Sequence, residues 1–329
     1  MNYKEEILKL KKELDVVLVA HFYQRDEVFE LADITGDSLE LAKKVMESDK
    51  EFVVFCGVGF MGESAKILNP QKRVLMPRIA CCAMARMIDE GYFLENLKKM
   101  NEAGISNDDI LPITYINSSA SVKARVGEMG GMVCTSSNAY KIIEKGLKSG
   151  KKIFFVPDRC LGQNFAKSLN LKSAIVGEGS DLKEADIICY NGFCSVHQQF
   201  SVEDIEFYRQ KFPDILIAVH PECDPSVCDA ADFVGSTSQL ITYIKGLDPE
   251  QKIAVGTEFN MVSRLRDKNT YILSSTKPEC PTMNETTLQD VYNTLKSIKD
   301  GKISKETEIT VSQETAIWAK VALERMFEV

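Results

Sequence analysis

The sequence lacks both a long apolar run and a surplus of positive charge. No segment approaches the roughly 18 apolar residues that a membrane-spanning helix needs, and the amino terminus lacks the basic and apolar blocks of a secretory signal. The formal net charge is −8, and Lys and Arg form no stripe that could follow a phosphate backbone. These absences predict a cytoplasmic protein that binds neither a membrane nor a nucleic acid.

Local metal-binding motifs are also missing. None of the ten cysteines belongs to the paired CxxC spacing of a zinc ribbon or to the short CxxCxxC run of a ferredoxin. The cytosol keeps thiols reduced, so these cysteines indicate thiols and metal ligands rather than a disulfide framework. A metal site in this chain would therefore draw its ligands from distant parts of the sequence.

The sequence does contain a regular alternation of strand-like and helical patterns. A chain of 329 residues is long enough for two or three compact units. Short apolar runs separated by helical periodicity are typical of α/β units with parallel sheets. We expect strands at residues 16–20, 52–55, 72–76, 110–116, 153–156, 187–190, 215–219, 253–255 and 271–273.

This alternation repeats as three similar units. In each unit, polar side chains follow the carboxyl end of a buried strand, which is where open α/β sheets bind ligands. These side chains are His21, Tyr115, Asn117, His220 and Glu222. We therefore predict three three-layer αβα domains with parallel sheets about a pseudo-threefold axis, comprising residues 1–85 with the C-terminal helices of 285–329, residues 86–200, and residues 201–284.

A cluster of hydroxyl side chains precedes a helix in every unit. One interpretation is helix capping, in which the side-chain oxygen accepts from a free backbone amide. The other is an anion site, because three helix starts in register would direct amides and partial positive charge at one point. A substrate with phosphate and carboxylate groups would fit the second arrangement. The hydroxyl residues are Ser38, Thr135, Ser136, Ser236, Thr237 and Ser238.

Each unit closes with a strand that is followed within a few residues by a cysteine. These cysteines are Cys82, Cys194 and Cys280, and a threefold arrangement would bring them to one point. A cubane iron-sulfur cluster held by three thiolates leaves its fourth iron open, and that iron can act as a Lewis acid. One cysteine per unit therefore favours dehydration or condensation over electron transfer.

Two questions about the other cysteines stay open. Cys81 adjoins Cys82 and could itself be the ligand, and Cys223 lies five residues before Cys228, so that a regulatory redox pairing is a second possibility. The rest are interpreted as core residues, because free cysteine is among the most buried residue types. The cysteines interpreted in this way are Cys56, Cys134, Cys160, Cys189 and, outside any redox pairing, Cys228.

All three histidines lie in the segments already described. His21 and His220 follow strands, and His197 lies three residues beyond Cys194, which are the places where proton transfer would be needed. Glu222 is the best candidate carboxylate for general acid–base catalysis, because burial beside a histidine would tune its pKa.

The chain also contains a series of short motifs that are specific in combination. In order, they are AHFYQ, ELADITGDSLELAKK, GFMGESAKIL, TYINSSASVKA, VCTSSNA, NGFCSVHQQF, HPEC, ADFVGSTSQ, GTEFNMVSRL and KPECPTM, from about residue 16 to about residue 290. This series resembles the quinolinate synthase family of de novo NAD biosynthesis. The resemblance implies a transferase that condenses iminoaspartate with dihydroxyacetone phosphate to give quinolinate, phosphate and water. It also implies a three-cysteine 4Fe-4S cluster at the junction of three αβα domains.

The resemblance carries over to individual residues. It implies that Cys82, Cys194 and Cys280 hold the cluster, since CAMA beginning at Cys82 matches the family's first cysteine motif and Cys81 does not. The residues implied to line the substrate cavity are His21, Tyr23, Ser38, Met61, Tyr115, Asn117, Ser136, His197, His220, Glu222, Ser236 and Thr237.

The chain shows two departures from the family pattern. After the second cluster cysteine, the family usually has an acidic residue directly following the histidine, and this chain has Gln198 there. The family also has Thr-Ser where this chain has Ser118 and Ser119. Some relatives carry a CxxC near the third cysteine that can form a disulfide. Here Met283 occupies the nearest candidate position, so we expect no such switch.

The expected catalytic roles combine the resemblance with the chemistry of these side chains. We assign proton transfer to Glu222 and Tyr23, and polarisation of the carbonyl and imine to His21 and Tyr115, with His197 completing the catalytic set. The open iron would bind a substrate hydroxyl or carboxylate during dehydration. Because iminoaspartate is unstable, we also expect a functional coupling to the enzyme that produces it.

Two other functions are weighed against this one. A hydro-lyase of the aconitase type would use the same open iron on a different acid. A non-catalytic iron-sulfur sensor would need a basic or apolar surface for its partner, and the acidic composition offers neither. A radical enzyme that uses S-adenosylmethionine is excluded, because its cluster cysteines would lie close together in the sequence.

Overall fold

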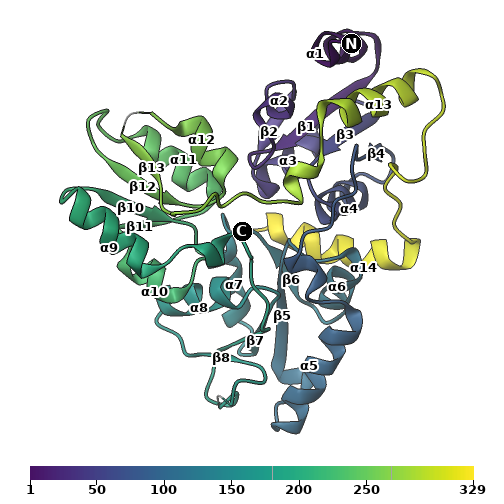
Figure 1. Cartoon of the computed structure of the whole chain (residues 1–329). Coiled ribbons are helices and arrows are strands. Elements are labelled where there is room, and N and C mark those ends of the chain that lie inside the picture. The colour runs from purple at the N-terminus through teal and green to yellow at the C-terminus, as the bar shows by residue number, and fades with distance from the viewer. Residues whose placement is uncertain (180, 268) are drawn as a thin grey trace.

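The chain forms three parallel β-sheets, each with helices on its faces (Figure 1). This architecture is that of a computed structural model, which describes residues 1–179, 181–267 and 269–329. The predicted α/β class with three layered units is confirmed. The threefold axis and the domain boundaries stay predictions.

The first sheet has the strand order β2-β1-β3-β4, and all its neighbouring strands are parallel. Alternate residues of β1 pack on α1 and α13 on one face, while the residues between them pack on α3 and α4 on the other. Burial on both faces explains its continuous apolar run. The elements are α1 (Tyr3–Glu13), β1 (Val16–His21), α2 (Asp26–Phe29), β2 (Ile34–Gly36), α3 (Ser38–Glu47), β3 (Phe52–Cys56), α4 (Gly59–Leu68), β4 (Arg73–Leu75) and η1 (Met84–Arg86).

The second sheet has the order β6-β5-β7-β9-β8, again with parallel neighbours. The elements of this part are α5 (Glu90–Glu102), η2 (Asn107–Asp109), β5 (Ile110–Tyr115), α6 (Ala120–Glu128), β6 (Met132–Cys134), α7 (Ala139–Leu147), β7 (Lys152–Val156), α8 (Arg159–Ser168), β8 (Ser173–Ile175), β9 (Ile187–Cys189) and η3 (His197–Gln199).

The third sheet repeats the order of the first as β11-β10-β12-β13. In every sheet the second strand along the chain lies at an edge, beside the first strand. The elements are α9 (Val202–Lys211), β10 (Leu216–Val219), α10 (Pro225–Ala230), β11 (Phe233–Val234), α11 (Thr237–Lys245), β12 (Ile253–Gly256), α12 (Phe259–Leu265), β13 (Thr270–Ile272) and η4 (Met283–Glu285).

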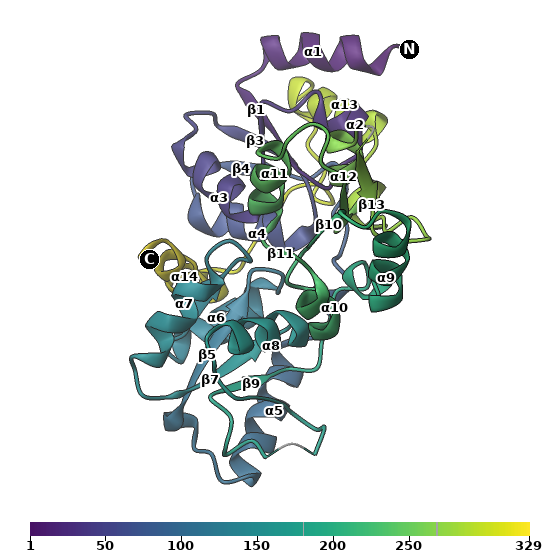
Figure 2. The ribbon, with the colours of Figure 1, turned by 90° about the vertical axis from the view of Figure 1, so that its left-hand side faces the viewer.

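The C-terminal helices return to the earlier parts of the chain. α13 (Leu288–Lys299) packs on α1, whereas α14 (Gln313–Glu324) packs along α6 and also touches α4. Figure 2 places α14 beside α6 and the chain's C-terminus, after η5 (Arg325–Phe327), next to it. The last residues therefore bridge the first and second units.

All nine predicted strands are confirmed, but four further strands were not predicted. These are β2, β6, β8 and β11, each of two or three residues at the edge of its sheet. Short length alone does not explain the omission, because β4 and β13 are also edge strands of three residues and were predicted.

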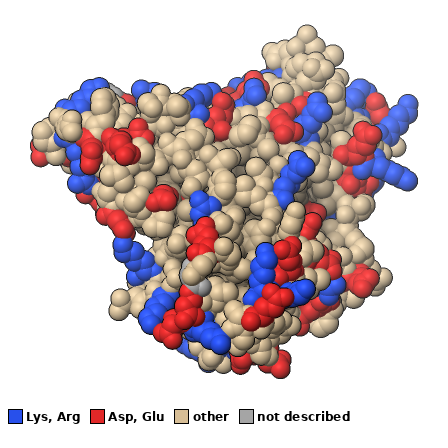
Figure 3. Space-filling view, turned by 60° about the horizontal axis from the view of Figure 1, so that its bottom comes forward, with Lys and Arg blue, Asp and Glu red and all other residues tan. Residues whose placement is uncertain are grey.

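The molecular surface mixes both signs of charge. On the face in Figure 3, acidic and basic side chains are interspersed around a broad area without charged residues. Within the described ranges, no helix is both long and apolar enough to cross a membrane.

Candidate active site and metal centre

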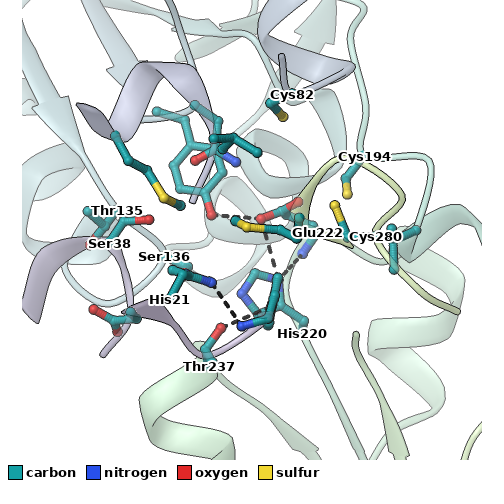
Figure 4. Close-up of a pocket in the computed structure, with 18 of the residues that line it drawn as sticks. His21, Ser38, Cys82, Thr135, Ser136, Cys194, His220, Glu222, Thr237 and Cys280 are labelled. Carbon is teal, nitrogen blue, oxygen red and sulfur yellow. Dashed lines mark hydrogen bonds and ion pairs between the residues drawn. The ribbon is translucent and has the colours of Figure 1, made fainter. Parts of the chain in front are cut away.

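One cavity lies where the strand ends of the three sheets meet (Figure 4). β1 ends at His21, β5 ends at Tyr115, and His220 directly follows β10. Each sheet therefore delivers side chains from its carboxyl edge, as expected for parallel α/β sheets. The lining residues are His21, Tyr23, Asp37, Ser38, Val58, Phe60, Met61, Cys82, Tyr115, Asn117, Thr135, Ser136, Cys194, Val196, His197, His220, Glu222, Thr237, Cys280, Thr282 and Met283.

The lining contains every residue implied to hold the cluster or to line the substrate cavity except Ser236, and of the predicted hydroxyl residues Ser238 also lies outside it. Ser236 is buried and caps α11. Its Oγ accepts from the backbone amide of Gln239, and the Gln239 side chain accepts from the amide of Ser236. Ser236 thus contributes to the start of the helix, while Thr237 beside it reaches the cavity.

The capping interpretation is wrong for Ser38. Asp37 caps α3 instead, because its Oδ1 accepts from the backbone amides of Leu39 and Glu40 at 3.0 Å each. A carboxylate is a favoured cap because it also complements the positive end of the helix. Ser38 follows as the first residue of α3 and lines the cavity.

The start of α7 differs from the expectation as well. Asn138 precedes this helix but makes no capping bond to it; its Oδ1 accepts from the amide of Thr135 instead. Neither Thr135 nor Ser136 caps α7, and both line the cavity. Both residues therefore lie at the cavity without capping the helix, although Oγ1 of Thr135 already donates to Oδ1 of Asn138.

Glu222 lies at the centre of a buried hydrogen-bond network. Its Oε1 accepts from the Tyr115 hydroxyl at 2.6 Å, and its Oε2 lies 3.2 Å from Nδ1 of His197. Burial by itself raises the pKa of Glu222, but the charges of His197 and His220 and the hydrogen bonds from His197 and Tyr115 lower it to about 2. Glu222 is therefore a carboxylate at neutral pH, next to a phenol that stays protonated.

Thr257 extends this network and was not predicted. Its Oγ1 lies 3.1 Å from Nε2 of His197 and 3.1 Å from the Tyr23 hydroxyl, which also contacts Thr237 at 3.0 Å. The signal that could have revealed it is its position directly after β12, within the GTEFN motif. Tyr23 and Glu222 are thereby joined through Thr257 and His197.

His21 is a neutral imidazole with a defined tautomer. Burial lowers its pKa to about 4, against the opposing charge of Asp37. Its Nδ1 accepts from the backbone amide of Tyr23 at 3.1 Å, so the ring proton resides on Nε2. His21 can thus donate a hydrogen bond without carrying charge.

The three predicted cluster cysteines lie around one side of the cavity, opposite Ser38, Ser136 and Thr237 (Figure 4). Each lies two or three residues before a short 3₁₀ helix, Cys82 before η1, Cys194 before η3 and Cys280 before η4. Burial raises the pKa of all three thiols, and backbone amides of these turns donate to the sulfurs and offset part of that rise. The three cysteines therefore share one local geometry, in which the amide bonds only partly offset the effect of burial.

The cysteine site fits a cluster held by three thiolates. All ten cysteines are free. Burial raises the pKa of Cys82 to about 12, and the charge of Cys280 raises it further. Burial also raises the pKa of Cys194, and the charges of Glu222, Cys82 and Cys280 raise it further. Three thiolates buried around one cavity are stable only with a cationic group between them. Cys81 is exposed and lies outside the described lining.

A second donor group borders the cysteines. Cys194, His197 and Glu222 each offer a ligand atom, and these atoms lie within 4.8 Å of one another. Both ring nitrogens of His197 already have partners in Glu222 and Thr257. The hydrogen-bond network therefore ends directly beside the cysteine site.

Cys223 and Cys228 are buried free thiols. Cys223 donates to the carbonyl of Gly256, and Cys228 contacts the carbonyl of His220 and the side-chain amide of Asn164. Burial raises the pKa of Cys228 to about 12. A raised thiol pKa disfavours redox exchange.

Taken together, the fold and the site define a three-unit α/β protein with a cysteine-bordered catalytic cavity. The model of the quinolinate synthetase A protein family matches residues 5–328, and the chain belongs to that family. It is 56% identical to the quinolinate synthase of Helicobacter pylori (strain HPAG1), over 99% of this chain and 98% of that protein. The quinolinate synthase of Streptomyces coelicolor is 40% identical, over 94% of this chain and 84% of that protein. The quinolinate synthase of Listeria monocytogenes is 38% identical, over 98% of this chain and 92% of that protein.

Proposed function

We propose that this protein is a quinolinate synthase that condenses iminoaspartate with dihydroxyacetone phosphate to give quinolinate, phosphate and water. The observation that carries the proposal is the convergence of three cysteines and the bonded pair of Glu222 and Tyr115 on one cavity, in a chain that matches the family almost from end to end. The product would serve the de novo synthesis of NAD.

The cluster is assigned to Cys82, Cys194 and Cys280, which border the cavity. A 4Fe-4S cluster bound by three thiolates would supply an open iron that acts as a Lewis acid on a substrate oxygen.

The opposite side of the cavity is suited to anionic groups. Ser38, Ser136 and Thr237 line it, and α3, α7 and α11 begin at or close to these residues. Helix N-termini and hydroxyls bind phosphate and carboxylate well. Holding both substrates between the two sides lowers the entropic barrier to condensation, since a reaction between two molecules becomes one within a complex.

Proton transfer is assigned to Glu222 and Tyr23. Glu222 is the ionised base, held by Tyr115 and His197. Burial raises the pKa of Tyr23 well above its usual value, so its phenol can donate a proton but does not ionise at rest. His21 donates from Nε2 to a carbonyl or imine of the substrate, while His197 and Thr257 orient the two proton-transfer groups.

Replacing Glu222 tests the assignment. We expect Glu222→Gln to lower quinolinate formation by about 100-fold or more, the usual loss when a general base is removed, with the iron content unchanged. Quinolinate would be measured in anaerobically reconstituted protein supplied with both substrates. The control is Glu308→Gln, whose carboxylate pairs with Arg73 away from the cavity and whose loss should not affect turnover.

Near-normal turnover of Glu222→Gln with an intact cluster would reject the assignment of proton transfer to Glu222. An assay without dihydroxyacetone phosphate distinguishes a quinolinate synthase from the competing hydro-lyase. A quinolinate synthase forms no product under that condition, whereas a hydro-lyase would still dehydrate its acid. The cytoplasmic location and the coupling to an iminoaspartate-producing enzyme stay predictions.

A further inference from the structure

A single carboxylate oxygen at the cavity joins all three sheets. Asp37 precedes α3, and its Oδ2 accepts from Oγ of Ser137 and from Oγ of Ser238, both at 2.7 Å. Ser137 lies between β6 and α7 of the second unit, and Ser238 lies in the first turn of α11 in the third. Segments about 100 residues apart in the sequence thus converge on one atom.

Asp37 is itself held in a fixed position. Its Oδ1 is the cap of α3, and its backbone amide donates to the carboxylate of Glu40 at 2.9 Å. The side chain is 5% exposed. Each carboxylate oxygen therefore accepts two hydrogen bonds: Oδ1 accepts them within the first unit, and Oδ2 accepts them from the other two units.

The residues joined at Asp37 are sequence neighbours of the cavity hydroxyls. A shift of the backbone at one of them moves the hydroxyl next to it, because consecutive Cα atoms are only about 3.8 Å apart. Ser137 and Ser238 are not among the residues that line the cavity in the described part of the chain. The neighbouring pairs are Asp37 with Ser38, Ser137 with Ser136, and Ser238 with Thr237.

We infer that Asp37 is a positioning residue that aligns Ser38, Ser136 and Thr237 into one binding site for the phosphate group of a substrate. The inference rests on the proposed function for the nature of that ligand. A carboxylate beside an anion site repels phosphate, so the charge of Asp37 opposes binding and its benefit is geometric. Charge and geometry therefore predict opposite effects of removing Asp37.

The main test removes the two serine hydroxyls and leaves the charge in place. We expect the double variant Ser137→Ala/Ser238→Ala to bind dihydroxyacetone phosphate and inorganic phosphate about tenfold more weakly than the wild type, as measured by calorimetric titration of the reconstituted enzyme. Hydrogen bonds to a charged group are the stronger ones. Ser137→Thr/Ser238→Thr keeps both hydroxyls and should restore most of the affinity.

The matched control is Ser149→Ala/Ser297→Ala. It also removes two bonded serine hydroxyls, which donate to the carbonyls of Gly146 and Thr294 away from the cavity. This variant should bind phosphate as the wild type does. Asp37→Asn provides the second variant. If Asp37 positions the cavity hydroxyls, this variant should bind phosphate more weakly although a negative charge has been removed.

Unchanged affinity in Ser137→Ala/Ser238→Ala, or equal or tighter binding in Asp37→Asn, would overturn the inference. A wild type that binds neither ligand would overturn it too. A wild type that binds phosphate but forms no quinolinate would count against the proposed function alone, and the comparison of the variants would still decide the role of Asp37.

Discussion

Lys123 is a fully buried cation beneath the loop that carries Asn117. Its Nζ donates to the carbonyls of Ile116 and Ser118, on either side of Asn117, and lies 5.4 Å from the centre of the Phe60 ring. Burial lowers the pKa of Lys123 to about 7, against the opposing charge of Glu63. The protein therefore holds a cavity-lining amide in place with an ammonium group that is costly to bury.

The buried lysine predicts a dependence of stability on pH. The pKa of Lys123 is about 7 in the folded protein and about 10.4 in the unfolded chain. Between these values the unfolded state binds more protons, so the contribution of Lys123 to stability is complete above about pH 10 and is lost as the pH falls towards 7. We expect the free energy of unfolding of the wild type to rise by up to about 2 kcal/mol relative to that of Lys123→Met when the pH is raised from 7.5 to 9.5.

Urea denaturation of both proteins at the two pH values measures this gain. Lys72→Met is the comparison variant, because Lys72 is also buried and its Nζ likewise donates to two backbone carbonyls, those of Ser48 and Lys50. A difference between wild type and Lys123→Met that stays constant with pH would contradict the prediction.

At the scale of elements, α6 and α14 pack with their backbones in close approach. Gly127 makes this possible, since a Cβ at this position would lie 2.1 Å from the carbonyl oxygen of Trp318. No side chain can be accommodated there without moving the helices apart. The small residue therefore sets the distance between the C-terminal helix and the second unit.

We expect Gly127→Ala to destabilise the protein by about 2 kcal/mol or more, because the backbone of α14 cannot give way as a flexible side chain would. The control is Gly91→Ala in α5, where a Cβ meets only the Asp89 side chain at 3.3 Å. Alanine favours a helix over glycine by about 0.5 to 1 kcal/mol, so Gly91→Ala should be neutral or stabilising. The denaturation midpoints of the two variants measure this difference. Equal losses of stability in both variants would refute the packing argument.

At the scale of the whole molecule, the candidate metal centre exists only because three distant segments meet. Cys82, Cys194 and Cys280 follow strands of three different sheets. A cluster bound to all three would connect the units and stabilise the folded state by mass action. We therefore expect metal loading and tertiary stability to be coupled.

The two adjacent cysteines make this coupling testable. Cys82→Ser should lose most of the iron taken up on anaerobic reconstitution and most of the accompanying rise in melting temperature, because Cys82 lines the cavity. Cys81→Ser should load like the wild type, since Cys81 is exposed. Iron and sulfide analysis together with thermal melts measure both effects. Normal loading of Cys82→Ser would exclude Cys82 as a ligand.

Local patterns were sufficient to predict much of the fold. Strands such as β1 and β5 are buried on both faces and appear as continuous apolar runs, so their positions follow from composition. The short edge strands β2 and β11 were not predicted, although β4 and β13, which are also short edge strands, were. The helix cap at Asp37 was missed because the hydroxyl of Ser38 next to it offered an equally plausible cap.

The sequence by itself determined the three α/β units, the strand ends that carry His21, Tyr115 and Glu222, and the family to which the chain belongs. Each of these depends on residues close together along the chain, where spacing and side-chain chemistry carry the information. Only the tertiary structure decided that Thr257 joins Tyr23 to His197 and that Asp37 binds serines of two other units. These contacts depend on how separate sheets pack against each other, and no local pattern specifies that packing.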